Sequence, residues 1–293
     1  MSKYICSLTG LFGAALVATA PAYAAPAADC DLVLQELGGG RINGYDALAG
    51  GDYIDQIRLR LRNKGDGVCN GVLRITRTAS FDRLDGPESS YLDYTIVDPT
   101  NIGQVILDPI SQQTQGLPVS VGAKSSIDIF PRLLVPGGQS GRQGRYFATL
   151  QAQVDLGPNQ DAVDREFTVS AQVLARVQAN FAGGRNATLD LGELAPNVVG
   201  SISMQIRSSA DIDVEVSSEN EGNLVRSANA YRIPYSMTFD SRPVDLGNGS
   251  SFNVELQNSV RGQSLPVVVT VGAFSNAPVG AYGDVVTFRI SAR

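Results

Sequence analysis

The sequence contains no histidine and no tryptophan, and only three of its 293 residues are cysteine. Without histidine, Ser–His–Asp and Cys–His catalysis are excluded, and so are most zinc sites. No P-loop or Gly-x-Ser-x-Gly elbow is present, and the glycine-rich stretches 38–44 and 137–144 do not fit a phosphate-binding fingerprint. These absences predict a protein that is not an enzyme and that holds no cofactor and no metal.

Positive charge is also scarce. The 29 Asp and Glu residues outnumber the 23 Lys and Arg residues, which gives a formal net charge of −6. A protein that binds nucleic acid needs a basic surface to meet the phosphates. We therefore expect no nucleic-acid partner.

Long hydrophobic runs are missing, except at the start of the chain. Lys3 precedes the apolar run Ile5–Ala20, which is followed by Pro21 and a small-x-small sequence at Ala22–Ala24. A positive start, a short apolar stretch and a cleavage-like site are typical of a secretory signal peptide. The run is shorter than the ~20 residues that span a bilayer. We expect residues 1–24 to be a signal peptide and the mature chain to be exported without spanning the membrane.

Export bears on the cysteines. Cys6 is removed with the signal peptide, which leaves Cys30 and Cys69 as an even pair. In an oxidising compartment such a pair forms a disulfide by default. We expect the two residues to be bonded.

What the sequence has in abundance is two-residue periodicity. In the run 53–63, for example, Ile57, Leu59 and Leu61 alternate with arginines at 58, 60 and 62. Alternating runs bounded by Gly, Pro, Asn and Asp are typical of antiparallel strands with one exposed face. No segment combines a helical apolar stripe with capping residues. The pattern predicts an all-β fold of sandwich type, and the length suits two domains.

One sequence pattern occurs twice. The stretch "GRYFATLQAQV" (144–154) matches "GAYGDVVTFRI" (280–290), with Leu150, Ala152 and Val154 in the register of Val286, Phe288 and Ile290. A second, weak match links "YLDYTIVD" (91–98) with "IPYSMTFD" (233–240). A domain-sized repeat of this kind predicts a duplicated domain. We expect domains at 25–156 and 166–293, joined by a polar linker at 157–165.

The second half resembles the spore coat protein U domain, from which archaic chaperone–usher pilus subunits are built. The resemblance rests on "FTVSAQVLA" (167–175), on "IPYSMTFD" and on "LPVVVTVGAFSNAPVGAYGDVVTFRI" (265–290). It implies two immunoglobulin-like antiparallel β-sandwich domains, the second lacking one strand. In such subunits a neighbouring chain supplies the missing strand, which is called donor-strand complementation.

The resemblance implies a donor-strand acceptor groove with the following lining: Phe167, Val169, Ala171, Val173, Tyr282, Val286, Phe288 and Ile290. It also implies three partners, namely the donor strand of a pilus subunit, a periplasmic chaperone and an outer-membrane usher. Because Cys30 is only the sixth residue of the expected mature chain, we expect no room for a donating arm. A subunit that accepts a strand but donates none is expected at the tip of the pilus, at the cell surface, as an adhesin.

The surface or host ligand of such an adhesin is expected at loops of the first domain. The stretches 40–53 and 107–118 carry apolar residues among small and polar ones, and we take these as candidate adhesive residues: Ile42, Tyr45, Leu48 and Ile110. Two further patterns are better explained as solvated strand faces than as sites. They are the arginines at 58, 60 and 62, and the acidic residues at 211, 213 and 215, which have the ligand type of a calcium site.

Two other functions fit the same features. Periplasmic assembly chaperones also consist of two immunoglobulin-like domains, and "IDIFPRLLVPGGQSG" (127–141) is similar to the proline-rich turn before their donor strand. The acidic charge and the duplicated ending speak against this alternative. The second alternative is a secreted β-sandwich binding protein unrelated to pili.

Overall fold

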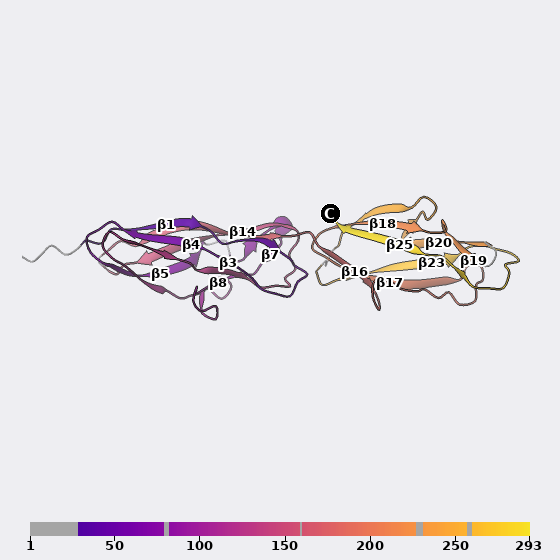
Figure 1. Cartoon of the computed structure of the whole chain (residues 1–293), viewed down its shortest axis with the longest axis horizontal. Coiled ribbons are helices and arrows are strands. Elements are labelled where there is room, and N and C mark those ends of the chain that lie inside the picture. Colours follow the sequence, from indigo (N-terminus) through magenta and orange to yellow (C-terminus); the bar gives the residue numbers. More distant parts are fainter. Residues whose placement is uncertain (1–28, 79–81, 159, 227–230, 257–259) are drawn as a thin grey trace, which may run out of the picture.

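The computed structural model describes residues 29–78, 82–158, 160–226, 231–256 and 260–293. The predicted signal peptide at 1–24 lies outside the described residues. Two β-sandwiches lie end to end and form a rod (Figure 1). The part of the chain described contains one 3₁₀ turn, η1 (Pro87–Ser89), and no α-helix, and it has no helix long and apolar enough to cross a membrane. The prediction of an all-β fold is confirmed.

The N-terminal domain, residues 29–173, contains three sheets. The first has the order β1 (Leu32–Gly38), β4 (Arg58–Asn63), β12 (Ser126–Ile129). The second has the order β10 (Gln113–Thr114), β9 (Val105–Asp108), β8 (Thr95–Val97), β13 (Arg132–Val135), β3 (Tyr53–Gln56). The third has the order β11 (Leu117–Val121), β5 (Cys69–Arg77), β14 (Gly144–Asp155), β15 (Val163–Val173), β2 (Arg41–Tyr45), with β6 (Leu84–Asp85) and β7 (Tyr91–Leu92) beside it.

The C-terminal domain, residues 177–293, contains two sheets. The larger has the order β16 (Val177–Phe181), β17 (Val199–Ser208), β23 (Gln263–Val271), β20 (Arg232–Phe239), β19 (Asn223–Arg226), β24 (Tyr282–Gly283), and β21 (Arg242–Val244) pairs with β20. The smaller has the order β22 (Ser250–Val254), β18 (Ile212–Ser218), β25 (Val286–Ala292). The order β16-β17-β23-β20 corresponds to strands A, B, E and D of an immunoglobulin fold, and β18-β25 corresponds to C and F.

The boundary between the domains differs from the prediction. Residues 157–165 do not form a linker. Residues 163–165 already belong to β15, which pairs with β14 over eleven residues and in parallel with β2. The N-terminal domain therefore extends to Val173, and the connection lies between Val173 and Val177. Gly157 and Pro158 mark a chain reversal, and a hairpin uses the same turn residues as a linker.

The two cores differ in how well they are closed. Among the described residues, the N-terminal core has 32 buried apolar residues and only 7 partly buried ones packed against it. The C-terminal core has 17 buried apolar residues and as many partly buried ones. Half of its apolar residues thus keep contact with solvent, which means that the C-terminal sandwich lacks part of its cover.

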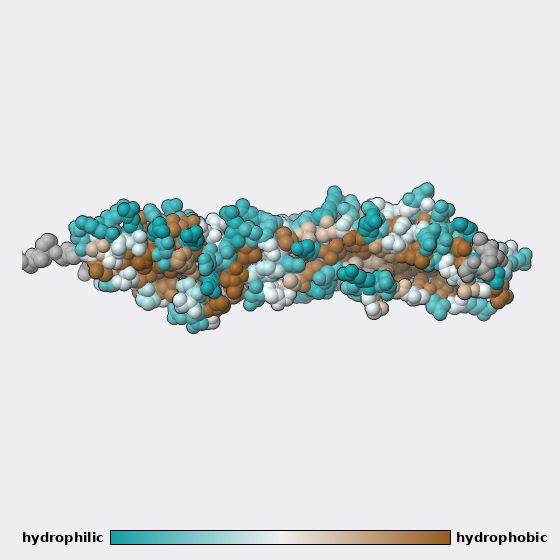
Figure 2. Space-filling model, in the orientation of Figure 1, coloured by the Kyte–Doolittle hydropathy of each residue, from teal (hydrophilic) through white to brown (hydrophobic). Residues whose placement is uncertain are grey.

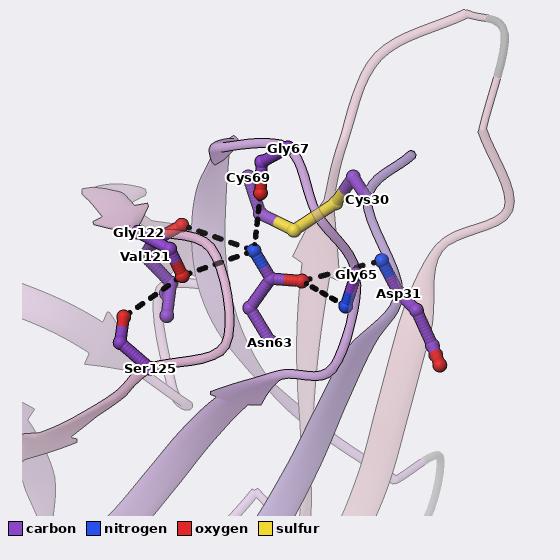
Figure 3. Close-up of a disulfide and its surroundings, with 9 residues drawn as sticks. All are labelled: Cys30, Asp31, Asn63, Gly65, Gly67, Cys69, Val121, Gly122 and Ser125. Atoms are coloured by element: carbon purple, nitrogen blue, oxygen red, sulfur yellow. Dashed lines mark hydrogen bonds between the residues drawn. A yellow bond between two sulfur atoms is a disulfide. The ribbon is translucent and has the colours of Figure 1, made fainter. Parts of the chain in front are cut away.

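The predicted disulfide is confirmed (Figure 3). Cys30 and Cys69 are bonded, with Cα atoms 5.3 Å apart. Beside them the fully buried Asn63 donates its amide nitrogen to the carbonyl oxygens of Gly67, at 2.6 Å, and Gly122, at 3.1 Å. Its amide oxygen accepts from the backbone N–H groups of Asp31 and Gly65. One side chain thus satisfies the polar backbone of three chain segments.

The variant Asn63→Ala tests this role. It leaves several buried polar groups without partners, so we expect the free energy of unfolding of the N-terminal domain to fall by about 3 kcal/mol. Urea denaturation followed by circular dichroism measures the loss. Asn101→Ala, at an exposed position, is the control and should cost less than about 0.5 kcal/mol. If the two variants were equally stable, the proposed role of the Asn63 side chain in satisfying buried backbone groups would be contradicted.

Candidate strand-acceptor site

The repeated Gly-x-Tyr pattern forms the same local structure twice. Tyr146 donates its hydroxyl to the carbonyl oxygen of Arg142 at 2.8 Å, and Tyr282 donates to the carbonyl oxygen of Pro278 at 2.8 Å, in each case four residues back. This bond is the tyrosine corner that marks the start of strand F in immunoglobulin-like domains. The corner identifies β14, and β24 with β25, as the F strands of their domains.

An added side chain would meet a neighbour at each glycine of the two patterns. A Cβ atom at Gly144, where φ is +135°, would lie 2.4 Å from Cγ of Pro87. A Cβ atom at Gly280 would lie 2.3 Å from Nε of Arg226. At Gly144 the positive φ and the Pro87 ring require glycine, whereas at Gly280 the neighbour is the end of the flexible Arg226 side chain.

The neighbours of the two F strands also match in register. In the N-terminal domain Ala152 pairs with Ile75 on β5. In the C-terminal domain its counterpart Phe288 pairs with Val216 on β18. On its other side β14 is covered by β15, whereas among the described residues no strand pairs with the other edge of β25. The position that β15 fills in one domain is thus open in the other.

Exposure of the F-strand side chains follows from this difference. Leu150, Ala152 and Val154 are fully buried in the N-terminal core. Val286, Phe288 and Ile290, which occupy the same register positions, are only partly buried. An uncovered edge with apolar side chains offers both a surface to bury and unpaired backbone N–H and C=O groups.

The other side of the opening is β16. It is an edge strand that pairs only with β17, and its inward residues Val177, Ala179 and Phe181 are partly buried. The Phe181 ring lies edge-on to Phe288 with centroids 6.1 Å apart, and Phe288 also contacts Phe239 at 5.6 Å. We call the opening between β25 and β16 the open seam; Figure 2 shows an apolar band along this domain, where Figure 1 draws the two strands.

Both ends of β25 are anchored although its edge is open. At its start, the Asp284 carboxylate accepts from the hydroxyls of Tyr235, at 2.5 Å, and Ser218, at 2.6 Å. At its end, the Gln143 side chain from the N-terminal domain donates to the carbonyl oxygen of Arg293. Backbone pairing with β18 holds the strand between these points. The seam therefore has one fixed side.

The structure divides the predicted groove residues between the two domains. Val286, Phe288 and Ile290 lie together along β25, and Tyr282 lies just before them on β24. The prediction is wrong for the other four, because β15 belongs to the N-terminal core, where all of them are buried: Phe167, Val169, Ala171 and Val173. The sequence pattern did not identify the seam residues of β16. Apolar residues occupy every odd-numbered position from 167 to 181, so the alternation continues unbroken from β15 into β16 and does not mark the domain boundary.

Of the four candidate adhesive residues, three are buried and one is exposed. Ile42 and Tyr45 lie on β2, which pairs with β15, and Leu48 follows them; all three are buried in the N-terminal core, so the prediction that they project is wrong. The apolar residues in this glycine-rich stretch anchor it to the core. Ile110 is exposed, at 50 % of its possible area, in the loop between β9 and β10.

The two charged patterns are engaged in ion pairs. Arg60 forms a bidentate ion pair with Asp128, in which Nε donates to Oδ1 at 2.6 Å and Nη2 donates to Oδ2 at 2.9 Å. Asp211 pairs with Arg142 across the domain boundary, at 2.8 Å, and Glu215 is 3.4 Å from Arg289. Over the ranges that the structure covers, no group of three or more acidic or cysteine side chains is arranged to hold a metal ion.

The comparisons with known proteins concern overall shape. No family model and no curated protein sequence matches the chain. Among solved structures, the chaperone–tip adhesion subunit complex of the archaic chaperone–usher Csu pili of Acinetobacter baumannii gives a TM-score of 0.44 at 14 % identity, over 88 % of this chain and 100 % of the other.

Two further solved structures have similar coverage. The CFA/I adhesin of enterotoxigenic Escherichia coli gives a TM-score of 0.41 at 10 % identity, over 88 % of this chain and 94 % of that one. The CupB6 tip adhesin of Pseudomonas aeruginosa gives 0.39 at 9 % identity, over 89 % and 93 %. Because these scores and identities are low, the functional inference rests on the strand order and the open seam.

The hydroxyl of Tyr235 provides a test of the anchor at Asp284. Burial, and then the hydrogen bond to the Asp284 carboxylate, raise the pKa of Tyr235 above its ordinary value of 10. The folded state therefore favours the neutral phenol, and its stability is lost as the pH rises above 10, where the unfolded chain ionises. We expect the C-terminal domain to be destabilised progressively as the pH rises above about 10, and Tyr235→Phe to reduce this dependence.

Denaturation at several alkaline pH values measures the effect. Tyr231→Phe is the control, because Tyr231 is a second tyrosine of the same domain. A pH dependence of the Tyr235→Phe variant equal to that of the parent chain would rule out the proposed coupling to Asp284.

Proposed function

We propose that the chain is a non-enzymatic tip subunit of a chaperone–usher pilus, whose C-terminal domain accepts a strand from another subunit. The observation that carries the proposal is the open edge of β25, at the position which β15 fills in the N-terminal domain. The missing strand is strand G of the immunoglobulin fold. A second chain supplies it by donor-strand complementation, with backbone hydrogen bonds to β25 and apolar side chains in the open seam.

The chemistry of the seam favours an extended segment with alternating apolar residues. The inward residues of β25 and β16 recur at every second position, which matches the period of a strand. Completing the burial of six such side chains stabilises the domain by roughly 6 kcal/mol, at about 1 kcal/mol for each half-exposed side chain. Pairing along β25 adds backbone hydrogen bonds, and only a segment with an extended backbone can form them.

The same edge would be a hazard before assembly, because an unpaired apolar strand invites aggregation. We propose that a periplasmic chaperone covers the seam first and that an outer-membrane usher exchanges it for the donor strand of the next subunit. The solved Csu structure is a chaperone–tip adhesion subunit pre-assembly complex. In this proposal the chain is exported, passes through the periplasm and ends at the cell surface, at the pilus tip.

A synthetic donor strand tests the proposal on the full chain without the signal peptide. The peptide 163–173 of this chain, "VDREFTVSAQV", fills the equivalent position in the N-terminal domain. We expect it to bind and to raise the free energy of unfolding of the C-terminal domain, by about 2.7 kcal/mol at a hundredfold excess over its Kd. Calorimetry and chemical denaturation measure the shift.

Matched variants sharpen this experiment. The peptide with Phe167→Asp and Val169→Asp should not bind. Phe288→Asp in the chain should abolish binding, whereas Arg289→Asp, on the outward face of the same strand, should leave it intact. A C-terminal domain that unfolds cooperatively at high temperature and is unchanged by the peptide would refute the proposal.

Adhesion is proposed for the N-terminal domain, at exposed apolar loop residues. Ile102 and Ile110 are 45 % and 50 % exposed in the loops before and after β9. We expect Ile110→Asp to weaken attachment of the chain to an apolar surface such as polystyrene about tenfold, because it removes a side chain worth about 1.5 kcal/mol when buried. The control is Val279→Asp, an equally apolar position of the C-terminal domain that is 95 % exposed. Equal attachment of all three proteins would disprove this assignment.

A further inference from the structure

A cavity lies where the two domains meet, and its lining includes no residue of β25 or β16. Its volume is about 650 Å³. The N-terminal domain lines it with Ser90, Tyr91, Asp93 and 138–140, and the C-terminal domain adds Arg207, Val260 and Arg261. Cavities of this size at domain interfaces are common ligand sites. This one is present only when both domains are in place.

The side chain of Arg207 is held in position. Its Nε donates to the carbonyl oxygen of Val260 at 2.8 Å. Its Cγ lies against Gly262, where an added Cβ would be 3.2 Å away and where φ is +99°. Val260 is itself buried and packs into the N-terminal core. Because Nε is engaged, both Nη groups stay available, and a guanidinium fixed in this way loses little entropy on binding.

The positive charge of the cavity is not neutralised within the chain. Every Asp and Glu of the sequence lies among the described residues, and the ion pairs found there include neither Arg207 nor Arg261. The one acidic residue of the lining, Asp93, is paired with Arg83 at 2.9 Å. The cavity therefore presents two arginines of unbalanced charge in a chain that is acidic overall.

The remaining lining suits a sugar. The Tyr91 ring is half exposed and has Arg83 on one face at 4.0 Å, which leaves an aromatic surface at the rim. The Gln139 side chain bonds to the backbone of Asp93 in both directions, and Ser90 bonds to Tyr146. These residues hold the wall rigid, while the arginines keep their free donors. Rigid polar walls with an aromatic rim favour hydroxyl-rich rings over flexible chains.

We propose that this interdomain cavity binds a carboxylate-bearing sugar residue, with Arg207 and Arg261 on the carboxylate and Tyr91 beside the ring. Paired N–H donors on guanidinium match the two oxygens of a carboxylate. The site goes beyond strand acceptance and does not require that the seam be filled. It gives the chain a second contact for a surface rich in acidic polysaccharide.

The experiment compares D-galacturonate with D-galactose, which differ in one carboxylate, by calorimetry on the full chain without the signal peptide. We expect galacturonate to bind at least about tenfold more tightly, because a charge-assisted hydrogen bond contributes about 1.5–3 kcal/mol. Arg261→Gln and Arg207→Gln should each remove this preference. Arg185→Gln, at an exposed position away from the cavity, should preserve it.

The outcomes separate the alternatives. Equal binding of the two sugars, or none at millimolar concentration, overturns the proposal. Competition by sulfate at the same concentration as galacturonate reveals a general anion site and also overturns it. If Arg207→Gln disturbs folding, Arg261→Gln decides, because no ion pair among the described residues involves Arg261. The donor-peptide experiment has a separate readout, so either proposal can fail alone.

Discussion

Each strand of an antiparallel sandwich needs a neighbour on both sides or a cover over its open edge, and this constraint governs the whole chain. In the N-terminal domain the eleven-residue pairing of β14 with β15 meets it, and most apolar residues of the core beneath are buried. In the C-terminal domain the corresponding F strand, β25, pairs with β18 on one side and has no described partner on the other. The partly closed core, the apolar band and the proposed function all follow from that single difference.

The sequence was sufficient to predict the all-β fold and the disulfide. Alternation identified the inward residues of β4, β18 and β25 correctly, because side-chain direction in a strand depends on parity alone. The repeated Gly-x-Tyr pattern was informative because the tyrosine corner fixes both residue types. The even cysteine pair was informative because the predicted export of the chain favours a disulfide.

The errors have a common cause, since parity does not say which domain a strand joins. The segment 163–173 reads equally well as the last strand of one sandwich or the first of the next. Only its long-range pairing with β14 and β2 decides. For the same reason Ile42 and Tyr45 read as loop residues in a glycine-rich stretch, whereas the parallel pairing of β2 with β15 buries them. Long-range partners are not encoded in local patterns.

The anchoring of β25 at both ends has a mechanical consequence. The strand runs along the rod (Figure 1), and the residue after its end, Arg293, is tied to the N-terminal domain through Gln143. The Arg142–Asp211 pair ties the start of its partner strand β18 to the same domain. A strand bound to its open edge and pulled along the rod would load every backbone hydrogen bond in shear at once, rather than peel them one by one. Tension would then pass through β25 directly into the interface between the domains.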